Sequence, residues 1–165
     1  MTFQAQQEYR FCTFYLGQER YAVDILAVRE ITRGLQVTPA RGSLSCIKGL
    51  LNLRGQIVTV ISPAAVLGLS QEEQSAESRL LVLKTNSELE ARQIHHHETS
   101  EDLISLWCDR ISDVVAVMGT EIKTPAAAAA GVASPETLDG VIEVESQLVR
   151  ILNPERLLEA AAGVC

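Results

Sequence analysis

The sequence predicts an all-β fold with minor helices, built as a barrel or a sandwich. About eight to ten short runs of Val, Ile, Leu and aromatic residues recur along the chain, and turn residues separate them. Closed or packed sheets hide the edges of such strands. The 165 residues, of which 47% are hydrophobic, are enough for one domain with one core or two small ones.

Two strands and a short helix are predicted near the N-terminus. Residues 11–16 form an apolar and aromatic run that ends at Gly17, and the alternation over residues 21–25 indicates the second strand. Asp24 is a candidate N-cap, and apolar residues recur every three positions over residues 25–31. We therefore expect a helix there of about two turns at most.

Residues 46–61 carry the most informative pattern. Two apolar runs meet at Arg54-Gly55, and only glycine takes a positive φ at a tight reversal without steric cost. This pattern predicts a hairpin. Ser62 and Pro63 follow as the cap and the first residue of a brief helix.

The second half of the chain is predicted to add strands and one helix. Apolar and β-branched runs predict strands over residues 79–84, 104–117, 141–144 and 148–152. The last two are expected to pair with each other. Asn153 and Pro154 then begin a C-terminal helix as its cap and first residue.

Three segments are not expected to contribute to the core. Residues 1–8 are predicted to be an N-terminal tail. Residues 85–102 are polar and contain His95, His96 and His97, so we expect a mobile, solvated loop insert. Residues 124–135 include the alanine run 126–130, which is too short to offset the cost of helix nucleation. We expect a connection with one helical turn at most.

The composition limits the cellular location and the classes of partner that we expect for this protein. No run reaches the roughly 18 apolar residues of a membrane helix, and the N-terminus lacks the basic and then apolar stretch of a secretory signal. The formal charge is −7 and the basic residues are scattered, so no cationic stripe is available for phosphates. We expect a cytoplasmic protein without membrane insertion and without a nucleic-acid partner.

Motifs for catalysis are absent from the sequence. It has no Gly-x-Ser-x-Gly elbow and no Gly-rich phosphate loop, and its four cysteines lack the paired spacing of zinc sites. The strongest metal candidate runs from His95 to Glu98, but its polar and charged flanks favour a solvated loop. We therefore expect no catalytic residue, metal or cofactor. A small metal-dependent hydrolase that uses this cluster with Asp102 or Asp109 remains the alternative.

Two charged residues lie in apolar surroundings. Arg54 interrupts the predicted hairpin, and Glu30 is near the end of the first predicted helix. Long charged side chains in such places are either paired or functional. We predict that Glu30 and Arg54 form a hydrogen-bonded ion pair at a functional surface.

The stretch around these two charges resembles a known family. It contains Val28-Arg29-Glu30-Ile31, the block Gly49-Leu50-Leu51-Asn52-Leu53-Arg54-Gly55, and the strand of residues 57–61. A strand with Asp109-Arg110 follows, and then residues 140–142 and 148–153. In this order the residues are similar to the CheW-like family of chemotaxis coupling proteins, over roughly residues 9–162.

The resemblance implies a single domain over residues 9–162, made of two five-stranded, SH3-like β-barrel subdomains that are packed together and intertwined. It also implies a non-enzymatic adaptor of bacterial two-component signal transduction. Its expected partners are the regulatory domain of a chemotaxis histidine kinase and the cytoplasmic tips of chemoreceptors. The family positions tied to binding correspond to Val28, Glu30, Gly49 and Arg54, with Asn52 and Gly55 shaping the turn.

The chain also departs from the family pattern. It has Ser62-Pro63 where family members usually carry Asp-Leu, a longer insert around His95, and the alanine run 126–130 in place of a Pro-containing connection. Two alternatives therefore stay open. One is a coupler of a related array that controls pili rather than flagella, and the other is a domain that scaffolds the array lattice without contacting receptors.

Overall fold

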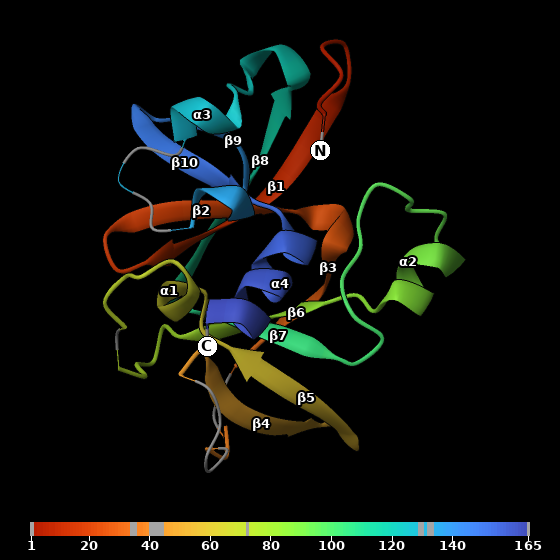
Figure 1. The fold of residues 1–165 in the computed structure, drawn as a ribbon, viewed down its shortest axis with the longest axis vertical. Helices are drawn as coiled ribbons and strands as arrows, with labels where there is room; N and C mark the ends of the chain where they lie inside the picture. The colour runs from red at the N-terminus through yellow and green to blue at the C-terminus, as the bar shows by residue number, and fades with distance from the viewer. Residues whose placement is uncertain are drawn as a thin grey trace.

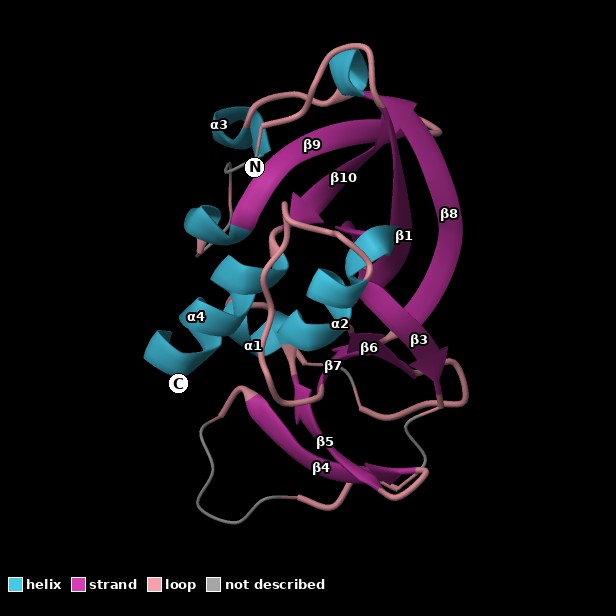
Figure 2. Cartoon of the chain, turned by 90° about the vertical axis from the view of Figure 1, so that its right-hand side faces the viewer, coloured by secondary structure: helices cyan, strands magenta, loops and turns pink. Residues whose placement is uncertain are grey.

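The computed structural model describes residues 2–33, 36–39, 45–71, 73–128, 131 and 134–164, and it contains two five-stranded sheets (Figures 1 and 2). The first sheet has the order β8-β1-β2-β10-β9, with strands β1 (Glu8–Leu16), β2 (Glu19–Asp24), β8 (Arg110–Met118), β9 (Leu138–Val144) and β10 (Gln147–Leu152). The second has the order β3-β6-β7-β5-β4, with strands β3 (Val28–Thr32), β4 (Ile47–Leu53), β5 (Gln56–Ile61), β6 (Arg79–Leu83) and β7 (Ile104–Cys108).

The two sheets are intertwined along the chain. β1 and β2 start the first sheet, β3 to β7 form the second, and β8 to β10 return to complete the first. Neighbouring strands are mostly antiparallel, but β2 pairs with β10 and β5 pairs with β7 in parallel. The predicted all-β class and the two five-stranded units are thus confirmed, while closure of each sheet into a barrel stays a prediction.

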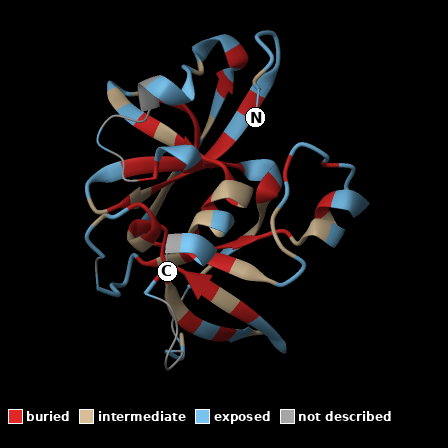
Figure 3. Ribbon diagram, in the orientation of Figure 1, coloured by how far each residue is buried: buried red, intermediate tan, exposed pale blue. Residues whose placement is uncertain are grey.

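One apolar core joins the two sheets. It contains Phe14 and Tyr21 from the first sheet and Leu81 and Leu106 from the second, all fully buried. Each sheet also buries side chains on its other face, such as Phe11 in the first sheet. In Figure 3 the buried positions accordingly concentrate where the strands meet and beside the C-terminal helix. Burial on both faces explains why several strands have nearly continuous apolar sequences.

Two helices with the predicted caps cover the junction between the sheets. Ser62 Oγ accepts a hydrogen bond from the Ala65 amide (3.2 Å) at the start of α1 (Pro63–Val66). Asn153 Oδ1 accepts one from the Arg156 amide (3.0 Å) before α4 (Pro154–Val164). α1 packs against α4, and Leu157 of α4 is fully buried in the shared core. None of the described helices is long and apolar enough to span a membrane.

The first predicted helix is mostly wrong. Asp24 does cap a helix, but this is only the single 3-10 turn η1 (Ile25–Ala27). From Val28 onward the chain is strand β3, which pairs antiparallel with β6. The three-residue spacing of Ile25, Val28 and Ile31 was compatible with both structures, and pairing with a distant strand decided between them.

The predicted strand over residues 104–117 is also wrong in one respect, because it is two strands in different sheets. Asp109 separates β7 from β8. Its Oδ2 accepts a hydrogen bond from the Gly17 amide (2.6 Å), which lies in the turn between β1 and β2. This contact anchors the chain where it crosses from the second sheet to the first.

The segment 85–102 contains a helix that the sequence analysis missed. Thr85 and Glu88 form a capping box, with the Glu88 amide donating to Thr85 Oγ1 (3.3 Å) and the Thr85 amide to Glu88 Oε2 (2.8 Å). This box begins α2 (Asn86–Ala91), so the loop prediction is wrong for that stretch.

The other two segments that were not expected to join the core, residues 1–8 and 124–135, contain little regular secondary structure where they are described. In the predicted tail, of which Met1 lies outside the described residues, Phe3 packs edge-on against Tyr9 (ring centroids 4.9 Å apart). The alanine run enters the single-turn α3 (Pro125–Ala128), as expected, and its last two residues lie outside the described residues. The 3-10 turns η2 (Gly119–Glu121) and η3 (Pro135–Thr137) flank α3 along the chain.

Candidate functional site

The β4–β5 hairpin presents the residues that the sequence analysis selected. Its two-residue loop is Arg54-Gly55, and both residues have positive φ, 50° and 84°. Two consecutive positive φ values are typical of the mirror-image turns that suit the twist of a hairpin. Asn52 Oδ1 accepts a hydrogen bond from the Gly55 amide (2.9 Å) and so supports the turn. The hairpin therefore holds Arg54 at its tip.

The predicted ion pair between Glu30 and Arg54 is present. Arg54 Nη2 donates to Glu30 Oε2, and the Arg54 side chain is 66% exposed whereas that of Glu30 is 24% exposed. A parallel link joins Arg29 Nη2 to Gln56 Oε1 (3.3 Å). β3 and β4 stand at opposite ends of the strand order of this sheet. These side chains consequently connect the β3 end of the sheet to the hairpin tip at the β4 end.

Gly49 and Val28 contribute to the shape of the site rather than to its accessible surface. Gly49 has a φ of 153°, and a Cβ at this position would lie 2.1 Å from the Thr38 carbonyl oxygen. Because glycine has no Cβ, Thr38 and Leu50 can form two backbone hydrogen bonds with each other (2.8 and 2.9 Å). Val28 is half-buried and packs against the shared core. The exposed members of the predicted set are therefore Asn52, Arg54 and Gly55, with Glu30 partly exposed.

An exposed apolar surface lies beside the ion pair, and the sequence analysis did not name the residues that form it. Leu50 and Ile57 are exposed, Ile57 by 61%, whereas their chain neighbours Leu51 and Val58 are buried. The signal was available, because side chains alternate between the two faces of a strand. Exposed aliphatic side chains next to a few charges are typical of a surface that binds another protein.

The hydrolase alternative finds no support in the arrangement of its residues. Within the ranges that the structure describes, one group of potential metal ligands converges, and it consists of Asp24, His96 and His97. Neither Asp102 nor Asp109 belongs to it. His95 is exposed and stands apart from the group.

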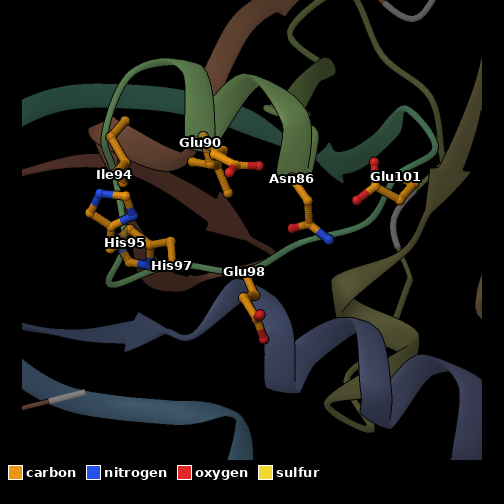
Figure 4. Close-up of a pocket in the computed structure, with 8 residues that line it drawn as sticks. Asn86, Glu90, Ile94, His95, His97, Glu98 and Glu101 are labelled. Carbon is orange, nitrogen blue, oxygen red and sulfur yellow. The ribbon is translucent and has the colours of Figure 1, made fainter.

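The prediction of a solvated histidine loop is wrong for His97. Its side chain is only 2% exposed, and its Nε2 lies 2.8 Å from Asp24 Oδ2. Figure 4 shows His95 and His97 after the end of α2, with Glu98 pointing toward α4. The polar and charged residues on either side of His97 therefore did not indicate that its side chain is buried.

Comparison with known proteins gives a consistent result. A family model described as "CheW-like domain" matches residues 10–162. The "Chemotaxis protein CheW" of Helicobacter pylori is 26% identical over 157 residues, which cover 91% of this chain and 81% of that protein. The protein of the same name from Klebsiella aerogenes is 29% identical over 150 residues, with the same coverage of 91% and 81%.

A solved structure shares the fold. The crystal structure of the scaffolding protein TtCheW from Thermoanaerobacter tengcongensis aligns with a TM-score of 0.75 at 20% sequence identity. The alignment covers 92% of this chain and 88% of that one. The arrangement of two sheets is therefore one that a scaffolding protein also uses.

Proposed function

This chain belongs to the CheW-like family of non-enzymatic chemotaxis adaptors, and we propose that its β4–β5 hairpin carries the surfaces that couple chemoreceptors to a chemotaxis histidine kinase. The observation that carries this assignment is the pairing of two unlike features on one hairpin. An exposed ion pair lies at the tip, and exposed aliphatic residues lie on the outer face.

The Glu30–Arg54 pair is the proposed receptor contact. Glu30 comes from β3 and Arg54 from the tip of the β4–β5 hairpin, so the pair joins the two opposite ends of the strand order of the second sheet. A charged pair at an interface selects the partner and its register more than it adds affinity. A cytoplasmic receptor helix with complementary polar groups suits such a surface. Gly49, Asn52 and Gly55 support this contact by shaping the hairpin, and Val28 supports it by fixing β3 on the core.

The outer face of the hairpin, with Leu50 and Ile57, is the proposed contact for the regulatory domain of the kinase. Burial of exposed aliphatic side chains provides the affinity that a stable complex needs. Because the two surfaces are adjacent but distinct, one chain can hold both partners at once. We further propose that the adaptor acts in the cytoplasm at receptor arrays, as one domain over residues 9–162; the family-model match over residues 10–162 supports the domain bounds.

Reconstitution tests the proposal. Receptor cytoplasmic fragments, the kinase and this chain are mixed, and kinase autophosphorylation is measured with and without attractant. We expect receptor control of the kinase only when the chain is present. Arg54→Ala should lose receptor control and keep kinase binding, whereas Ile57→Asp should lose kinase binding. Arg10→Ala is the matched control, because Arg10 also forms an exposed ion pair, with Glu8 (3.3 Å), but on the first sheet.

Three results would contradict the proposal. The kinase could respond to receptors without the chain, the chain could bind neither partner at about 100 μM, which corresponds to roughly 5.5 kcal/mol, or Arg10→Ala could behave like Arg54→Ala. Kinase binding without any receptor contact would instead favour the lattice-scaffold alternative. Repeating the assay with the receptors of a pilus-controlling array and of a flagellar array decides which output the chain serves.

A further inference from the structure

The segment that follows α2 is held in place and is not free in solvent. Ile94 is buried, and Gln93 adopts a positive φ of 59° where the helix ends. The Thr99 amide donates to Asn86 Oδ1 (2.8 Å), which closes the segment back onto the start of α2. The chain bends at His96, so that two adjacent side chains face the same way, with ring centroids 4.4 Å apart.

Both imidazoles face one carboxylate oxygen. Asp24 Oδ2 lies 2.8 Å from His97 Nε2 and 3.5 Å from His96 Nε2, and the three ligand atoms lie within 4.8 Å of one another. Asp24 Oδ1 is occupied by the Leu26 amide (3.0 Å), the cap of η1. This bond orients the carboxylate in the way that outer-shell hydrogen bonds orient metal ligands.

These separations are compatible with a tetrahedral metal ion. Zinc–nitrogen and zinc–oxygen bonds of about 2.0 to 2.2 Å place two ligand atoms about 3.3 Å apart at a tetrahedral angle. The two distances from Asp24 Oδ2, 2.8 and 3.5 Å, lie on either side of that value. To reach bonding geometry, His97 Nε2 would have to move about 0.5 Å away from Asp24 Oδ2, and His96 Nε2 about 0.2 Å towards it.

One carboxylate oxygen and two imidazole nitrogens are ligands that a zinc-like ion accepts. The nearby Lys84 ammonium group donates to the Leu26 carbonyl (2.7 Å), and Asp24 Oδ2 still faces the two imidazoles.

A path to solvent is present on the His96 side. Asp24 and His97 are buried, whereas the His96 side chain is 39% exposed. Asp24 and His96 line a cavity of about 180 Å³. Glu8 and Tyr9 of β1 form part of its wall. An ion and its remaining water ligand could therefore enter here without any opening of the core.

From this geometry we propose that Asp24, His96 and His97 form a binding site for a zinc-like divalent metal ion, with water at the fourth position. The ion would link the segment that follows α2 to the start of η1. This single turn connects β2 of the first sheet to β3 of the second. The ion has a stabilising role and no part in catalysis. The proposal does not rest on the adaptor function, since it needs only the three ligands.

Metal titration of the full-length, untagged chain tests the site. The chain is stripped with a chelator and titrated with Zn²⁺ by isothermal calorimetry, and its thermal unfolding is followed with and without Zn²⁺. Co²⁺ is then used as a spectroscopic substitute, whose absorption reports tetrahedral coordination. We expect one Zn²⁺ per chain, a higher melting temperature in its presence, and a tetrahedral Co²⁺ spectrum.

Two variants make the test specific. His96→Ala should weaken Zn²⁺ binding at least about tenfold, because a ligand is lost. This variant should keep the fold, as circular dichroism can verify, because His96 is exposed. His95→Ala is the matched control and should bind Zn²⁺ like the parent chain. Absence of saturable Zn²⁺ binding, unchanged binding by His96→Ala, or an equal loss in His95→Ala would overturn the proposal.

Discussion

Two acidic residues on either side of η1 form contacts of the same chemical kind in opposite environments. Glu30 meets Arg54 at the surface, where the side chains are 24% and 66% exposed. Asp24 meets His97 in the interior, where they are 5% and 2% exposed. Water screens the first contact, so it contributes little to stability and can reorganise around a partner. The second contact has no such screening, and loss of either group leaves the other desolvated and without its partner.

The largest effect is expected for Asp24→Ala. The substitution removes the carboxylate that caps η1 and faces both histidines, so it should lower the free energy of unfolding by about 3 kcal/mol. Urea unfolding with a chelator present measures this. Asp102→Ala, at an exposed position of the neighbouring segment, is the control and should change stability by less than about 0.5 kcal/mol. Equal effects of the two substitutions would show that the buried carboxylate contributes no more to stability than the exposed one.

His97→Ser and His95→Ser sharpen the comparison within a single tripeptide. His97 is buried against Asp24 and His95 is exposed. We expect a loss of about 2 kcal/mol for His97→Ser and less than about 0.5 kcal/mol for His95→Ser. Melting of the two variants under identical metal-free conditions gives the answer. A similar melting temperature for both would mean that the buried hydrogen bond contributes nothing.

The pH dependence of stability should report the contribution of the buried Asp24 carboxylate. The pKa of Asp24 is lowered in the folded chain, so its contribution is fully present above the unfolded-state value of about 3.9 and is lost as the pH falls below that value. Asp24→Asn should therefore flatten the decline of stability below about pH 4, in metal-free buffer. Denaturant midpoints at several pH values test this, and a parallel decline in the parent and the variant would contradict it.

Among the substitutions that break one of the two contacts, Arg54→Ala should have the smallest effect on stability. The exposed ion pair should contribute less than about 1 kcal/mol, so the midpoint of unfolding should barely move. A double-mutant cycle with Glu30→Ala isolates the interaction energy between the two side chains. A second double-mutant cycle measures the interaction energy between Asp24 and His97. A larger energy for Glu30 and Arg54 than for Asp24 and His97 would contradict the expectation that the buried contact is the stronger one.

Local features of the fold could be predicted from the sequence. The hairpin at Arg54-Gly55 follows from a glycine between two apolar runs, and α1 and α4 follow from Ser62 and Asn153 as caps. The Glu30–Arg54 pair was predictable because both charges lie in apolar stretches. The hairpin and the two helix caps depend mainly on residues within a few positions of one another. The Glu30–Arg54 pair instead joins residues 24 positions apart.

Helix α2 was missed although its capping box of Thr85 and Glu88 is local, but most of the other features that were not predicted depend on contacts between distant residues. Asp24 and His97 are 73 positions apart, so no local pattern could show that this histidine is buried. Likewise, β3 is a strand because it pairs with β6, although its apolar spacing also suited a helix. Asp109 divides one apolar run between two sheets because it binds the Gly17 amide, 92 positions away. The sequence around Gly49, a predicted site residue, does not indicate its geometry, which depends on the close approach of the Thr38 backbone.

The chain order of the strands has a consequence for incomplete chains. β3 to β7 are contiguous in sequence, so residues 28–108 contain every strand of the second sheet. The first sheet instead needs β10 beside β2, a parallel pair in which Val149 meets Arg20. A nascent or truncated chain that lacks β10 would expose one edge of β2 with unpaired backbone groups, ready to pair with another strand. Only the final part of the chain removes that open edge.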